Sequence, residues 1–205
     1  MPIEPDVLKT LRPQTYAKVR DEVRDGDILL CSAHDPFSKL IRWATHSQWS
    51  HVAIAFRMDK IDRVMVLEAV EKYGVRTVPL STFIARTSSG VTPYPGHILL
   101  ARHESFTART TRSRMQRMAG FAFDRLGDPF ANAEGIKILL RILLGRFAIR
   151  LPKSLSPDDE FICSEYVARC LHSAGVEVPW DGLGFISPAD IAADPRVWPV
   201  AQIKT

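Results

Sequence analysis

The sequence predicts an α+β fold, in which a small antiparallel β-sheet in the first half of the chain precedes helices in the second half. Short runs rich in Val, Ile and Leu, bounded by turn residues, are concentrated before residue 104, as expected of strands. After residue 104, apolar residues recur mainly at helical spacing. The 205 residues are 46% hydrophobic and 24% charged, which is typical of a folded chain large enough to bury a core. We therefore predict a single domain over residues 1–205.

Five segments of the first half have the composition of strands and are expected to form the sheet. They cover residues 26–33, 51–58, 63–70, 74–80 and 97–103. A short helix is predicted between the first two strands, within residues 35–48, because four apolar residues recur there at helical spacing: Phe37, Leu40, Ile41 and Ala44.

Two longer helices are predicted in the second half of the chain. The first lies within residues 105–126, and Gly127 is well placed to end it. Its arginines are expected to face solvent, and its apolar face contains Met115, Met118, Ala119, Ala122, Phe123 and Leu126. The second starts near residues 158–162 and ends before Gly175. Its apolar face contains Tyr166, Val167, Cys170, Leu171 and Ala174.

The segment FICSEYVARC, residues 161–170, places Cys163 in or near the first turn of this last helix. Unpaired backbone N–H groups and the positive end of the helix dipole favour a thiolate over a thiol at such a position. Cys170 lies two turns further along, and Cys31 lies inside a predicted strand, so both are expected in the core. Cys163 is therefore the candidate nucleophile.

A nucleophilic thiol needs a base, and His51 is the candidate because it opens the strand HVAIAF at an edge from which it can face a cleft. Glu68 is the candidate for holding the imidazole, since it is the charged residue inside the apolar run VMVLEAV and a buried carboxylate needs a partner. Two alternatives remain open at this point: His51 as a structural residue, and Glu68 pointing outward from a half-exposed sheet. The other histidines are less favourably placed: His34, His46, His97, His103 and His172.

Four segments together resemble the YiiX/YebB-like group of permuted NlpC-type papain-like cysteine hydrolases. They are GDILLCSAHDPFSKLIRWATHSQWSHVAIAF, VLEAVEKYGVRTVPLSTF, FICSEYVARCLHSAGV and ISPADIA, in this order over residues 26–192. The resemblance implies a circularly permuted papain-like (NlpC-type) fold, in which a small antiparallel sheet or barrel precedes the helix that carries the catalytic cysteine. It also implies Cys163 as nucleophile, His51 as base and Glu68 as the third polar residue.

These groups would support an acyl-enzyme mechanism, with the backbone N–H of Cys163 as one oxyanion donor. The resemblance implies cleavage of an amide, peptide or isopeptide bond, with cell-wall peptides as one candidate substrate. Related permuted folds such as lecithin retinol acyltransferase act on lipids, so a lipid-directed thiol acyltransferase or esterase is the alternative. The sequence assigns no substrate-binding residue and no second oxyanion donor, and leaves hydrolysis and acyl transfer both open.

Other binding functions have weaker support. The net charge is +4, and the basic run at 109–117 makes a non-catalytic nucleic-acid-binding module the next class, but base-stacking aromatic residues are lacking there. The segment 134–150 has the pattern of a basic amphipathic helix, which suits either the core or an anionic membrane surface. Phosphate-binding glycine loops, an EF-hand pattern and metal-ligand spacings are missing from the sequence, so no cofactor or metal is expected.

Three irregularly spaced cysteines and a start without a signal-peptide pattern favour a reducing, cytoplasmic location. No apolar run reaches the length of about 18 to 20 residues that a membrane-spanning helix needs. The resemblance is weakest at residues 128–160, which are expected to form an insertion or lid.

Overall fold

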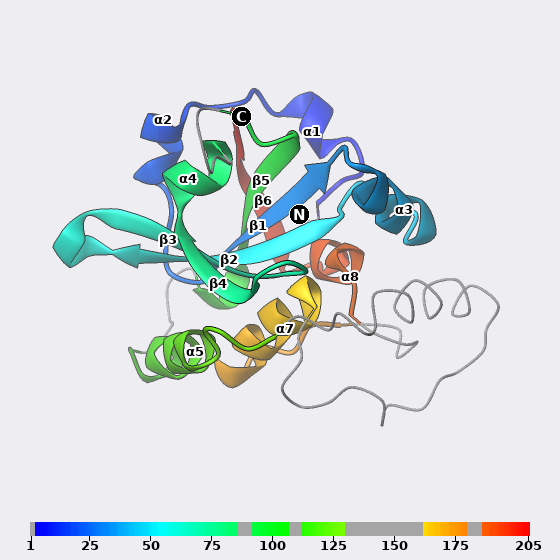
Figure 1. Ribbon diagram of the computed structural model, residues 1–205. Coiled ribbons are helices and arrows are strands. Elements are labelled where there is room, and N and C mark those ends of the chain that lie inside the picture. The colour runs from blue at the N-terminus through cyan, green and yellow to red at the C-terminus, as the bar shows by residue number, and fades with distance from the viewer. Residues whose placement is uncertain (1–2, 86–91, 107–111, 130–161, 180–185) are drawn as a thin grey trace, which may run out of the picture.

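Six strands form one open antiparallel sheet in the order β4-β3-β2-β1-β5-β6 (Figure 1). The structure is a computed structural model that describes residues 3–85, 92–106, 112–129, 162–179 and 186–205. The strands are β1 (Asp27–Ala33), β2 (His51–Met58), β3 (Arg63–Val70), β4 (Gly74–Pro79), β5 (Gly96–His103) and β6 (Val197–Ile203). The five predicted strands and the antiparallel sheet are confirmed, and the sheet is open rather than closed into a barrel.

Strand β6 was not predicted, because Pro199 interrupts its sequence. Proline cannot donate to a strand ladder and is tolerated at a sheet edge or a bulge. Both conditions hold here, since β6 is an edge strand and its register with β5 shifts between Leu100 and Ala101, the residue that faces Pro199.

Helices cover both faces of the sheet (Figure 1). One side carries α2 (Tyr16–Arg20) and α4 (Leu80–Ala85), and the other carries α5 (Arg112–Asp124), α7 (Cys163–Ser173) and α8 (Pro188–Ala193). Helix α1 (Val7–Thr10) adds Val7 to the core on the α7 side. Helix α3 (Pro36–Ala44) connects β1 to β2, and two short 3-10 turns, η1 (Asp59–Ile61) and η2 (Glu104–Phe106), follow β2 and β5.

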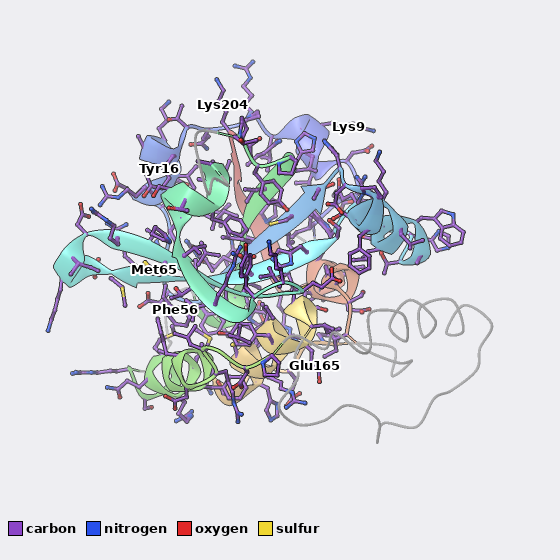
Figure 2. All side chains as sticks on the ribbon, in the orientation of Figure 1. Lys9, Tyr16, Phe56, Met65, Glu165 and Lys204 are labelled. Carbon is purple, nitrogen blue, oxygen red and sulfur yellow. The ribbon has the colours of Figure 1, made fainter. Side chains whose placement is uncertain are left out.

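The core has two parts, one on each face of the sheet, and side chains fill the space between the sheet and the helices (Figure 2). Leu30, Ile54 and Leu67 pack with Tyr166 and Leu171 of α7 on one face. The opposite face buries Leu29, Ala53 and Val66 under α2 and α4, through Val19, Leu80 and Phe83. Because both faces are covered, β1 is buried at every position, and its sequence is a continuous apolar run rather than an alternating one.

The three predicted helices correspond to α3, α5 and α7, with two corrections at α5. The described part of this helix starts at Arg112, and residues 105 and 106, which were predicted to lie in the helical segment, belong to the turn η2 instead. Leu126 is 39% exposed rather than part of the apolar face, since α5 ends at Asp124 and the helical spacing no longer applies beyond it. The predicted solvent-facing arginines Arg112, Arg114 and Arg117 are exposed.

Four helices were missed because they contain only four to six residues, too few to show a period. Helix α8 nevertheless has a detectable signal, a capping box between Ser187 and Asp190 with Pro188 in the first turn. Apart from residues 128–129, the predicted insertion or lid at 128–160 lies outside the described residues. The same is true of the predicted amphipathic helix at 134–150 and of Arg109, so these remain predictions.

Candidate active site

Cys163 is the first residue of α7, as the sequence predicted. The preceding residue, Ile162, is extended and makes no side-chain cap, so the first turn keeps its backbone N–H groups available. Two hydrogen bonds fix this turn: the Ser164 hydroxyl donates to the Ile186 carbonyl oxygen over 2.6 Å, and the Tyr166 hydroxyl donates to the Ala122 carbonyl oxygen over 2.8 Å. The helix is therefore anchored on two sides, and the Cys163 side chain is partly exposed.

His51 is the first residue of β2, at the end of the sheet toward which α7 points its first turn. It pairs with Cys31 of β1, and the preceding Ser50 is tied to β1 by its N–H bond to the Cys31 carbonyl oxygen over 2.8 Å. The ladder between β2 and β3 starts only at Ile54, so His51 lies beyond its end. The imidazole is thus held on a firmly paired backbone while its ring faces groups from β3 and α7.

Glu68 lies on β3 with its side chain fully buried, so the alternative of an outward-facing carboxylate is wrong. One carboxylate oxygen, Oε2, is 2.7 Å from His51 Nε2. The other, Oε1, accepts two hydrogen bonds from Arg76 of β4, from Nε over 2.9 Å and from Nη2 over 2.6 Å. Since the carboxylate can only accept, Nε2 of His51 carries a proton, and the opposite ring nitrogen, Nδ1, is left to face the sulfur of Cys163.

Cys163, His51 and Glu68 shift each other's pKa values in the directions that an ion pair requires. Burial raises the pKa of the Cys163 thiol, but the charge and hydrogen bond of His51, with the backbone N–H groups of Val52 and Ser164, lower it to a net value below 9.0. Burial lowers the pKa of His51, but Cys163 and then Glu68 more than offset this and raise it to about 10. The site therefore favours a thiolate beside an imidazolium.

The pKa of Glu68 is also lowered, although burial alone would raise it. After burial, the largest effects on this pKa are the hydrogen bond and charge of His51, followed by the charge and hydrogen bonds of Arg76, and all of these lower it. A buried carboxylate stays ionised when it is paired in this way. Glu68 can therefore stabilise the positive charge of His51 without taking its proton.

The other two cysteines are buried, as predicted. Burial raises the pKa of Cys170 to about 12, which makes it a poor nucleophile. Among the remaining histidines, His103 is fully buried. Its Nδ1 accepts the Ser105 N–H over 3.1 Å, and its Nε2 lies 3.5 Å from Asp194 Oδ2 without meeting the geometry of a hydrogen bond.

Arg76 is the polar partner that the sequence reasoning missed. Its position opposite Glu68 follows from the register of β3 and β4. Gly74, at the start of β4, has a positive φ of 67°, and the short hairpin between β3 and β4 brings residues 68 and 76 opposite each other, a register that composition and periodicity do not determine. Thus the site extends over four residues on β2, β3, β4 and α7.

Residues 22–134 match the model of a family described as permuted papain-like amidase enzymes, YaeF/YiiX, the C92 family. The chain belongs to this family. The matched residues include His51 and Glu68 but end before Cys163. In the structure the sheet with His51 precedes the helix with Cys163. Because the family is described as papain-like amidases, the chain is a member of a cysteine hydrolase family.

A solved structure of similar fold is that of the metalloprotein yiiX from Escherichia coli O157:H7. It is 24% identical, with a TM-score of 0.61, and the match covers 87% of this C92 chain and 96% of the other. No curated protein matches the chain. Within the described residues, no group of three or more His, Cys, Asp or Glu side chains is arranged to hold a metal ion. None of the described helices is long and apolar enough to cross a membrane.

Proposed function

We propose that this C92-family chain cleaves an amide, peptide or isopeptide bond with Cys163 as nucleophile, His51 as base and acid, and Glu68 as the group that orients His51. One observation carries the proposal: His51 binds Glu68 through Nε2 over 2.7 Å and faces Cys163 at the start of α7, where each of the two groups shifts the pKa of the other toward a thiolate and an imidazolium. A thiol next to an imidazole that is itself oriented by a carboxylate is the arrangement that activates a nucleophile.

The reaction follows from the protonation state of the pair. The Cys163 thiolate attacks the amide carbonyl carbon, a C–S bond forms, and the carbonyl oxygen becomes an oxyanion that the Cys163 backbone N–H is placed to bind. The intermediate collapses with cleavage of the C–N bond, and the leaving amine takes the proton from His51. Water, with His51 as base, then hydrolyses the thioester and regenerates the thiol.

Glu68 keeps its negative charge through these steps. Its hydrogen bond to Nε2 fixes the tautomer and ring orientation, so that Nδ1 faces the thiol. The nearby charge also stabilises the imidazolium that forms when Cys163 loses its proton. This role explains why a charged residue is retained inside the apolar strand β3.

The substrate class proposed is an amide or peptide, with cell-wall peptides as one candidate. The family description supports an amidase. The substrate specificity of such sites comes from loops. Most of the predicted insertion or lid at residues 128–160 lies outside the described residues, so the proposal names no substrate-binding residue there. Transfer of the acyl group to another nucleophile would use the same thioester and is separated from hydrolysis by identifying the product.

The test is selective alkylation followed by substitution. With iodoacetamide at mildly acidic pH, mass spectrometry should find Cys163 modified before Cys31 and Cys170, because the pKa of Cys163 is lowered, that of Cys170 is raised, and both Cys31 and Cys170 are buried. Earlier modification of Cys31 or Cys170 would refute the nucleophile assignment.

The Cys163→Ala variant should keep its unfolding transition but lose hydrolysis in a panel of amide, isopeptide, thioester and lipid-ester substrates. Cleavage of the lipid ester alone by the wild type would favour a lipid-directed enzyme and overturn the proposed substrate class. Amide cleavage that persists in Cys163→Ala would overturn the mechanism.

A further inference from the structure

Arg76 is the one cation that touches the candidate site from outside the proposed triad, among the described residues. It projects from β4 across the hairpin to Glu68, its partner in the strand register. Figure 1 shows β4 beside β3 at this edge of the sheet. Both of its hydrogen bonds go to Oε1 of Glu68, and His51 takes Oε2, so the two oxygens of the carboxylate have separate partners.

The charged groups of the site alternate in sign along a single chain of contacts. The groups that face Glu68 are His51 from β2 and Arg76 from β4. His51 in turn faces Cys163 from α7. From thiolate to guanidinium, the charges are negative, positive, negative and positive, so the ionised site has no net charge. Without Arg76 it would carry one uncompensated negative charge in a largely buried place.

The geometry points to Arg76 as a positioning residue: by holding Oε1 of Glu68, it fixes Oε2 on His51 and keeps the carboxylate ionised. This inference rests on the proposed triad and deepens it. Arg76 acts through Glu68 and touches neither the thiol nor the imidazole. Its effect should therefore be seen in the thiolate fraction of Cys163, and should depend on the Glu68 carboxylate.

The two-pronged contact explains why an arginine suits this position. Nε and Nη2 hold Oε1 together, which restricts rotation of the carboxylate, whereas a lysine supplies only a point charge. The guanidinium carbon lies 4.8 Å from the centre of the Tyr73 ring, and this stacking restrains the other side of the group. Because a guanidinium does not lose its proton in the working pH range, its influence on Glu68 is constant.

A different role, in which Arg76 binds an anionic group of the substrate, is the competing explanation. The Arg76 side chain is 30% exposed, so such contact is sterically possible. The two roles differ in one respect: a substrate-binding arginine has no reason to change the reactivity of Cys163 when substrate is absent.

The first experiment measures the alkylation rate of Cys163 by iodoacetamide from pH 4 to pH 9, in the full chain without substrate. In Arg76→Met the rise in rate should move to higher pH by about one unit, which slows alkylation about tenfold on the acidic side. Arg76→Lys should recover part of this shift, because it restores the charge but not the paired hydrogen bonds.

The matched control is Arg57→Met. Arg57 lies on β2, is exposed to a similar extent at 27%, and pairs with Asp59 and Asp21. It should leave the profile unchanged. An unchanged profile in Arg76→Met, or an equal shift in Arg57→Met, would overturn the inference.

The second experiment repeats the comparison in a Glu68→Gln background. If Arg76 acts through the carboxylate, Arg76→Met should now slow alkylation by less than about twofold, since the two substitutions share one interaction. An equal effect in both backgrounds would show that Arg76 acts independently of Glu68 and would overturn the inference. Thermal unfolding of each variant checks that the compared proteins are folded. If Arg76→Met does not fold, Arg76→Lys takes its place in the comparison of the two backgrounds.

Failure of this inference is distinguishable from failure of the proposed function. If Cys163 is alkylated first in the wild type and Cys163→Ala is inactive, but the Arg76 variants have the wild-type profile, only the role of Arg76 is wrong. If Cys163 is not the preferred site of alkylation, the proposed function fails, and the inference fails with it.

Discussion

The sheet contains two fully buried carboxylates that are each held by an arginine from the adjacent strand, and their surroundings differ in one partner. Asp27 of β1 binds Arg102 of β5 through both oxygens, with Nε to Oδ1 at 2.6 Å and Nη2 to Oδ2 at 2.7 Å. Its remaining contact is the Arg24 backbone N–H. Glu68 instead gives Arg76 one oxygen and keeps the other for a titratable group, the imidazole of His51.

This difference reverses the net effect on the pKa of the acid. Burial raises the pKa of Asp27 and outweighs the hydrogen bonds from Arg102 and Arg24. At Glu68 burial acts in the same direction, but His51 and Arg76 together outweigh it and the pKa falls. A single buried ion pair need not recover the cost of desolvation, whereas a second cation can. We infer that the Asp27–Arg102 pair joins β1 to β5, whereas the Glu68–Arg76 pair tunes His51.

The largest expected contrast between the two carboxylates is in activity. His51→Ala should lower the rate of amide cleavage on the order of 100- to 10,000-fold, the usual contribution of a general acid–base group. Glu68→Ala should lower it less, and Glu68→Gln least of the three, because the amide oxygen can still accept the Nε2 proton. Asp27→Asn should leave the activity of the folded protein unchanged. Steady-state kinetics on one amide substrate compares all four.

The matched control is Glu71→Gln, because Glu71 is an exposed acid three residues after Glu68. It should behave like the wild type. Wild-type activity in Glu68→Ala would remove Glu68 from the site and end the contrast with Asp27.

A second contrast is in stability. Arg102→Met leaves the Asp27 carboxylate buried without its guanidinium and should lower the free energy of unfolding by about 3–5 kcal/mol. Arg76→Met should cost less, because Glu68 keeps the His51 contact and Arg76 is 30% exposed whereas Arg102 is 9% exposed. Urea unfolding of both variants measures the difference. An equal loss in the two would mean that both arginines serve mainly to stabilise the sheet.

The sequence predicted five of the six strands and three candidate site residues because each of these has a local signal. His51 opens a strand, Glu68 interrupts an apolar run, and Cys163 precedes a helix with a clear apolar face. The two arginine clamps have no such signal. Arg102 reaches Asp27 across 75 residues, and Arg76 reaches Glu68 only through the hairpin register. Residue pairs of this kind are fixed by strand order and register, which composition and periodicity do not determine.

The smallest contrast is in the pH dependence of stability, where the two acids should differ in sign. The pKa of Glu68 is lowered on folding from its ordinary 4.5, so its ionised form adds stability above that pH, and this stability is lost as the pH falls through the folded pKa. The pKa of Asp27 is raised from 3.8, so the folded protein binds this proton more tightly than the unfolded chain does. Its contribution therefore decreases as the pH rises through the range above 3.8.

Urea unfolding between pH 3.5 and pH 6 of the wild type, Glu68→Gln and Asp27→Asn should reveal the two signs. As the pH falls, the advantage of the wild type over Glu68→Gln should shrink, while its stability relative to Asp27→Asn should grow. Both changes should be smaller than the loss in Arg102→Met, because each involves one proton rather than a stranded charge. If both stability differences changed with pH in the same direction, folding would shift the pKa of Glu68 in the same direction as that of Asp27. Glu68 would then not be held ionised as the counter-charge of His51.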